Sequence, residues 1–172
     1  ADALSNLTEN YLDGAWRVAQ ERYPGIEFAV IAMGRFGGRE LGFASDADVV
    51  YVVDDAGAGE ETLPRATALV REIIDLTTDP LFPFELDAGL RPEGKNGPLV
   101  RSLEAYRAYY ERWALGWESQ ALLRARDIVG DTALRERFVQ LADGIRYPED
   151  FPEDAKREIR RIKARVEAER LP

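Results

Sequence analysis

Two aspartates two positions apart, Asp46 and Asp48, stand where the hydrophobic run 48–55 begins. Because alternate residues of a strand point to the same face, these two carboxylates would lie together. Like charges at this spacing destabilise each other unless a cation lies between them, and carboxylates are ligands that suit Mg²⁺. The pair is compatible with a cation site at a strand entrance, but for Asp-x-Asp alone a solvated strand end is the favoured interpretation.

A pair of glycines, Gly37 and Gly38, closely follows the apolar run 27–34, and the letters RELG after them favour a short helix. A glycine-rich bend at the N-terminus of a helix presents free backbone N–H groups and a positive dipole end to a phosphate. A tight turn without any ligand is the alternative interpretation. Gly-Gly by itself does not separate the two.

The composition excludes several kinds of chemistry, because the 172 residues include neither cysteine nor histidine. Disulfides, thiolate zinc sites and nucleophiles activated by histidine are therefore absent from this sequence. The net charge of −9 indicates a protein that does not bind nucleic acid. No apolar run approaches the roughly 20 residues of a membrane span, so we expect a soluble, cytoplasmic protein.

Apolar periodicity predicts the elements that position these residues. It indicates a helix that ends at the YPG of 23–25, strands at 27–34 and 48–55, a helix at 63–77 and a shorter strand at 83–88. This order is typical of an α+β fold with a small mixed sheet and flanking helices.

The second half of the chain has helical spacing from residue 102 onward, with Asp131 as a predicted N-cap. We therefore expect a core domain over 1–100 with its N-terminal helix. Residues 101–172 would form a helical segment, the start of a truncated helical domain, in which Arg124 and Arg126 pair with Glu118 or Asp127.

The order strand, Gly-Gly, Ser45-Asp46-x-Asp48, strand resembles the nucleotidyltransferase superfamily that includes DNA polymerase β. The resemblance implies a glycine motif that holds a triphosphate and an Asp-x-Asp pair that holds two Mg²⁺ ions. It also implies a third carboxylate on a later strand. The segment FELDAGLRP supplies Asp87 for this position, with Glu85 on the same strand face as the alternative.

Three longer blocks resemble the glutamine synthetase adenylyltransferase family: MGRFGGRELGFASDADVVYV, ELDAGLRPEGKNGPLVRS and YYERWALGWESQALLRARDIVGD. That family has two paralogous halves, one that attaches AMP to a tyrosine of glutamine synthetase and one that removes it by phosphorolysis. LRPEGKNGPLVRS and the last segment resemble the second, adenylylating half of the actinobacterial type. Gly89 is a departure, because some relatives have a basic residue there, and a phosphate contact would then be missing.

The resemblance implies in-line attack of the tyrosine hydroxyl on the α-phosphate of ATP, with Asp46, Asp48 and Asp87 as catalytic metal ligands. Further residues would bind the phosphates: Gly37, Gly38, Ser45, Arg35 and Arg91. A solvated surface position is the alternative for Arg35, and an ion pair with Glu93 is the alternative for Arg91. The implied partners are glutamine synthetase and, through the full-length enzyme, a PII-type signal protein.

Two other functions remain open from the sequence. The deadenylylating half would use the same acidic residues with inorganic phosphate as the attacking group. A module that senses a nucleotide or binds a partner without turnover would need the fold but not all three carboxylates.

Overall fold

A computed structural model of the chain describes residues 1–43, 45–54, 59–78, 85–113 and 120–147, together with positions 153, 156, 157, 160, 161, 163, 164 and 168. Its centre is a five-stranded sheet with the order β3-β2-β1-β5, in which β4 also pairs with β2. The strands are β1 (Phe28–Ala32), β2 (Ala47–Val53), β3 (Leu86–Asp87), β4 (Val100–Ser102) and β5 (Arg126–Gly130). Strand β1 is antiparallel to β2 and β5, whereas β3 and β4 are parallel to β2. The predicted α+β class with a small mixed sheet is confirmed.

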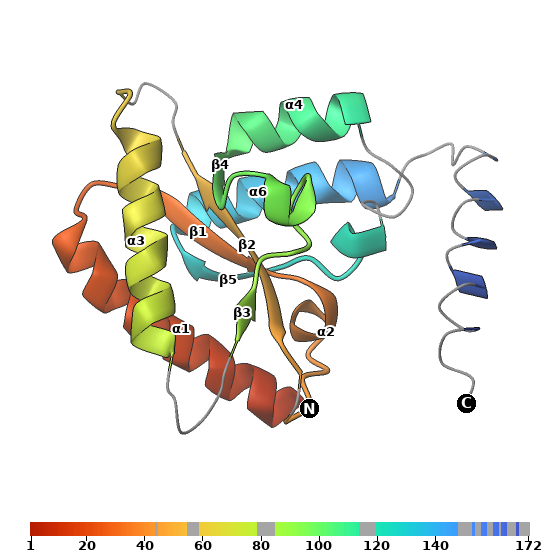
Figure 1. The fold of residues 1–172 in the computed structure, drawn as a ribbon, viewed down its shortest axis with the longest axis horizontal. Helices are drawn as coiled ribbons and strands as arrows, with labels where there is room; N and C mark the ends of the chain where they lie inside the picture. Colours follow the sequence, from red (N-terminus) through yellow and green to blue (C-terminus); the bar gives the residue numbers. More distant parts are fainter. Residues whose placement is uncertain are drawn as a thin grey trace.

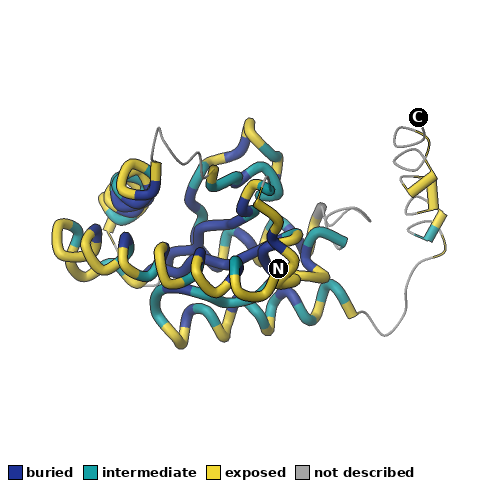
Figure 2. The backbone as a smooth tube through the Cα atoms, turned by 90° about the horizontal axis from the view of Figure 1, so that it is seen from below, coloured by how far each residue is buried: buried dark blue, intermediate teal, exposed yellow. Residues whose placement is uncertain are grey.

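Helices cover both faces of this sheet (Figure 1). One face packs against α1 (Asp2–Arg22) and α3 (Thr62–Thr77), and the other against α4 (Leu103–Trp113) and α6 (Thr132–Arg146). Two short helices lie in connections, α2 (Gly34–Gly37) and the 3₁₀ helix η1 (Gly94–Asn96). Figure 2 shows the sheet buried between helices whose outer faces are exposed.

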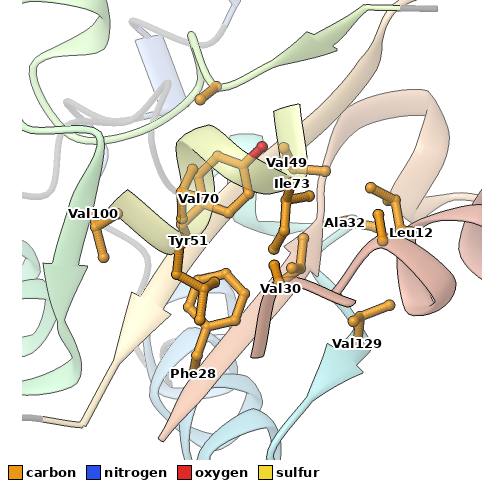
Figure 3. Packing of buried hydrophobic residues seen from close by; sticks show 14 of the residues in the cluster. Leu12, Phe28, Val30, Ala32, Val49, Tyr51, Val70, Ile73, Val100 and Val129 are labelled. Carbon is orange, nitrogen blue, oxygen red and sulfur yellow. The ribbon is translucent and has the colours of Figure 1, made fainter. Parts of the chain in front are cut away.

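Side chains that alternate along β1 and β2 divide the core in two. Val30, Val49 and Tyr51 belong to the cluster that includes α1 and α3, which Figure 3 shows from close by. Ile31 and Val50 belong to the cluster on the α4 and α6 side. Because both faces are buried, these strands read as continuous apolar runs rather than as alternating ones. Each fully buried Val, Ile or Phe stabilises the fold by about 1.5–3 kcal/mol.

The first half of the chain folds largely as its periodicity predicts. The first helix ends at Arg22, directly before the YPG segment, and α3 buries its predicted face. Asp131 caps α6, because its carboxylate accepts a hydrogen bond of 2.8 Å from the N–H of Leu134. The described positions between 153 and 168 are helical.

The helical interpretation of the second half is wrong for Arg126–Gly130, which forms β5 and pairs with β1. The predicted division at residue 100 falls inside β4, and the described residues that follow include α4, β5 and α6, which join the same sheet and core. Tyr106 and Tyr110 of α4 contribute to that core. The side chains of Trp113 and Trp117 lie outside the described residues. Among the described helices, none is long and apolar enough to cross a membrane.

Candidate functional site

Asp48 and Asp87 are brought together by the pairing of β2 with β3. These strands are parallel, and Asp48 is the register partner of Asp87. Paired residues of neighbouring strands point to the same face, so the two carboxylates lie side by side although 39 positions separate them in the sequence. The predicted partnership of these two aspartates therefore has a structural basis in one sheet register.

The surroundings of Asp48 favour its neutral form. Partial burial raises the pKa of the Asp48 carboxyl above its usual value, and the negative charges of Asp87 and Asp46 raise it further. The backbone N–H of Arg35, which donates to this carboxylate, and the Arg35 guanidinium act in the opposite direction. A cation between Asp48 and Asp87 would offset the like-charge repulsion and favour the ionised form.

Asp46 directly precedes β2 and is exposed, whereas Asp48 and Asp87 are partly buried. Across the described part of the chain, no three acidic side chains converge as a ready-made metal cluster. Mg²⁺ is commonly held by only one or two carboxylates, with water and phosphate oxygens in its other positions. The pair Asp48 and Asp87 fits this donor set, and Asp46 contributes charge from the solvent side.

The glycine bend differs from its predicted geometry. The sequence predicted a short helix after Gly37 and Gly38. In the structure the short helix α2 spans Gly34–Gly37, and Gly38 is its C-cap. The N–H of Gly37 donates to the carbonyl of Met33 at 2.7 Å, and that of Gly38 donates to Gly34 at 3.1 Å. These N–H groups are therefore used within the chain, and phosphate contact by Gly37 and Gly38 stays a prediction.

The glycine that the carboxylates need is Gly34, which sequence reasoning missed. It has a left-handed φ of +50°, and a Cβ added to it would lie 2.2 Å from Oδ2 of Asp48. The absence of a side chain here lets the first turn of α2 approach the Asp48 carboxylate. The sequence signal for this role was a glycine directly after Met33, where the first predicted strand ends.

Arg35 and Ser45 meet beside this carboxylate. The Arg35 guanidinium donates a 3.1 Å hydrogen bond to Oγ of Ser45, which also accepts from the N–H of Gly42 at 3.2 Å. Arg35 is exposed. The two residues thus place a positive charge at the open edge of the acidic pair, where phosphate oxygens would lie.

Arg91 does not form the ion pair with Glu93 that was its alternative role. Its guanidinium donates to the carbonyl oxygens of Ala88, Gly97 and Lys95 at 2.8, 3.1 and 3.2 Å. Glu93 pairs instead with Arg101. Arg91 therefore holds together the loop that follows Asp87, and any phosphate contact by it remains a prediction.

Gly89 stands where some relatives have a basic residue. In this chain it lies against Asp87 of the acidic pair. Its N–H donates to Oδ1 of Asp87 at 2.7 Å, and an added Cβ would lie 2.9 Å from the same oxygen. The glycine fixes one oxygen of Asp87 without crowding it. Glu85, the alternative to Asp87, is exposed and precedes β3.

Two arginines before and in β5 secure the glycine bend. Of their two predicted partners, Glu118 lies outside the described residues, and the prediction of Asp127 is wrong. Arg126 pairs with Glu9 at 2.6 Å and donates to the carbonyl oxygens of Gly37 and Phe36 at 3.0 and 3.2 Å. Arg124 pairs with Glu40 at 2.7 Å, so that neither arginine takes Asp127 as its partner.

The fold and the arrangement of these side chains together indicate the kind of ligand that the site can bind. Two carboxylates on neighbouring strands beside a surface arginine are residue types that can hold a divalent cation and a phosphate group. Comparison with known proteins gives the family. Residues 3–141 match the family described as glutamate-ammonia ligase adenylyltransferase, and the chain belongs to this family.

Proteins similar to this chain carry the name bifunctional glutamine synthetase adenylyltransferase/adenylyl-removing enzyme. The protein of Leifsonia xyli is 57% identical over 176 residues, which cover 100% of this chain and 18% of that protein. The Streptomyces coelicolor protein is 51% identical over 181 residues, 99% of this chain and 18% of its own length. The Mycobacterium tuberculosis protein is 54% identical over 151 residues, 84% of this chain and 15% of its own length. The chain therefore spans less than a fifth of these relatives.

Proposed function

We propose that this chain carries a nucleotidyl-transfer site that moves AMP from Mg²⁺-ATP to a tyrosine hydroxyl of glutamine synthetase. The observation that carries the proposal is the register pairing of Asp48 with Asp87 beside Arg35, in a chain of this family. The names of the relatives supply the acceptor protein and the transferred group. A cytoplasmic setting and a PII-type partner acting through a longer protein belong to the same proposal.

The residues of the chain have separate tasks in this reaction. The N–H of Arg35 and the N–H of Gly89 each fix one carboxylate, and Asp48 and Asp87 lie on the same face of the sheet. Asp48 and Asp87 would hold Mg²⁺, with Asp46 adding negative charge from the solvent side, and the ion would neutralise these carboxylates and the charge of the phosphates. The Arg35 guanidinium, held by Ser45, would contact the phosphates from the open side.

The transfer step balances with the groups of this site. The acceptor oxygen forms a bond to the α-phosphorus, the bond from that phosphorus to the bridging oxygen breaks, and pyrophosphate leaves with the electron pair. Asp87 accepts the hydroxyl proton, since a sequence without histidine leaves a carboxylate as the available base. Positioning and charge neutralisation account for most of the acceleration in such reactions.

The printed names of the relatives also include an adenylyl-removing activity. In that second candidate function, phosphate attacks AMP-tyrosine and the tyrosine oxygen leaves, with the same acidic pair and Arg35 in place. A binding module without turnover would tolerate the loss of Asp87, whereas both enzymatic functions would not.

The test is the intact mass of glutamine synthetase subunits after incubation with the chain, ATP and Mg²⁺. We expect the added mass of one AMP with the wild type and none with Asp87→Asn. The matched control is Asp75→Asn, which removes an exposed aspartate of α3. Adducts formed equally by Asp87→Asn would refute the acidic-pair assignment. Loss of AMP from pre-adenylylated subunits with phosphate, without gain in the first arm, would select the removing reaction.

A further inference from the structure

Phe43 is the most solvent-exposed large apolar residue among the described residues. Its side chain is 101% exposed, whereas the next most exposed large apolar residues reach 65%. A Phe left in water forgoes about 1.5–3 kcal/mol of burial. The fold of the described residues therefore gains no burial energy from the aromatic ring at this position.

The loop that carries Phe43 is tied to the rest of the molecule on both sides. The N–H of Ser45 donates to the carbonyl of Gly42 at 3.1 Å, which closes a tight turn around Phe43, and Leu41 before the turn is buried. Arg39 bonds to the side chains of Asp2 and Asn6 on α1 at 3.1 and 3.0 Å. The exposed ring is therefore carried by a turn that is anchored to the rest of the molecule.

The turn borders the candidate site. Phe43 lies two positions before Ser45, whose hydroxyl holds Arg35, and three before Asp46. Any macromolecule that brings an acceptor hydroxyl to Asp48 and Asp87 would approach close to this turn.

The chemistry around the ring favours a protein over a small ligand. Small molecules bind in concave sites lined by several apolar side chains. The exposed neighbours of Phe43 are instead glycines and charged residues: Gly38, Arg39, Glu40, Gly42 and Asp46. A single aromatic side chain on an exposed turn is the form of an interface anchor that fills a pocket on its partner.

We propose that Phe43 is an anchor that inserts into an apolar pocket of the acceptor protein, next to the hydroxyl that receives the nucleotidyl group. This inference rests on the proposed function, because glutamine synthetase is taken as the acceptor. It adds an interaction residue that neither holds the nucleotide nor takes part in the chemistry.

The experiment compares Phe43→Ala with the wild-type chain in two assays, direct binding to immobilised glutamine synthetase and steady-state transfer. We expect binding to weaken about tenfold or more and KM for glutamine synthetase to rise equally, with kcat and KM for ATP unchanged. Phe43→Leu should restore part of the loss, since it returns apolar volume. The control Val18→Ala trims an exposed apolar residue of α1 and should leave both assays unchanged.

Each outcome separates this inference from the proposed function. Unchanged binding and KM for Phe43→Ala, in a chain that transfers AMP, overturn the inference alone. A higher KM for ATP instead assigns the ring to the nucleotide and also overturns it. Weakened binding by Phe43→Ala in a chain without transfer supports the inference and refutes the proposed reaction, whereas no binding by the wild type overturns both.

Discussion

Gly37 is expected to tolerate no side chain, because α2 approaches another backbone segment there. A methyl group added at Gly37 would lie 1.9 Å from the carbonyl oxygen of Arg124 and 2.8 Å from that of Ala32. Ordinary van der Waals contact begins at 3.4 Å, so the first contact falls short by 3.4 − 1.9 = 1.5 Å. Both obstacles are backbone, so one segment has to shift.

The cost of this shift in Gly37→Ala follows from two contributions. Overpacking of a well-packed site destabilises by about 1–3 kcal/mol. The hydrogen bonds from Arg126 to the carbonyls of Phe36 and Gly37 would also be strained, at about 1 kcal/mol each. We therefore expect a loss of about 3–5 kcal/mol in the free energy of unfolding, or roughly 6–20 °C in Tm.

Urea denaturation followed by circular dichroism measures this loss, and Gly14→Ala is the matched control. Gly14 lies inside α1 with nothing within 4 Å of an added Cβ. Alanine there should raise the free energy of unfolding by about 0.5–1 kcal/mol, because glycine is a poor helix former. If Gly37→Ala unfolded at the same urea concentration as Gly14→Ala, the close approach of α2 to Arg124 would be wrong.

Three further substitutions test the account. Tyr51→Phe should raise the free energy of unfolding by about 1 kcal/mol, because the buried Tyr51 hydroxyl has no hydrogen-bond partner among the described residues; a loss of stability in urea would contradict this. Asp48→Asn should raise Tm by about 1–4 °C at pH 7 without divalent cations. Because the pKa of Asp48 is raised in the folded state, protonation of Asp48 favours the fold. The stability advantage of asparagine should therefore vanish as the pH falls below the ordinary pKa of 3.8. Equal melting temperatures of both proteins at every pH would exclude repulsion between Asp48 and its acidic neighbours. Arg126→Lys should lower the free energy of unfolding by about 1–2 kcal/mol, because lysine cannot reproduce the planar fork that joins Glu9 to two carbonyls; unchanged urea midpoints would show that a single charge suffices.

The sequence predicted elements whose apolar residues repeat over many positions. The strands β1 and β2 and the helix α3 follow from such runs, and Asp131 follows from the local chemistry of an N-cap. Strand β4 is three residues long, too short for a periodic signal. Strand β5 begins with Arg126 and Asp127 after a helical pattern, so only its pairing with β1 defines it.

The candidate site was predictable in its residue types but not in its contacts. The pairing of Asp48 with Asp87 depends on the parallel register of β2 and β3, which no local pattern gives. The order of helix and glycines was predicted wrongly because long-range groups stabilise α2. The carboxylate of Asp48 accepts from the N-terminal turn of α2, and Arg126 donates to its last carbonyls across 89 and 90 positions.

The most direct test of the acidic pair as a cation-dependent phosphate site is calorimetric titration of the chain with ATP, with and without Mg²⁺. The account predicts ATP binding that requires Mg²⁺ and that is lost in Asp48→Asn, whose fold is expected to be at least as stable as the wild type. Asp75→Asn, with its change on α3, should bind as the wild type does. Equal, Mg²⁺-dependent binding by Asp48→Asn and the wild type would contradict the central claim.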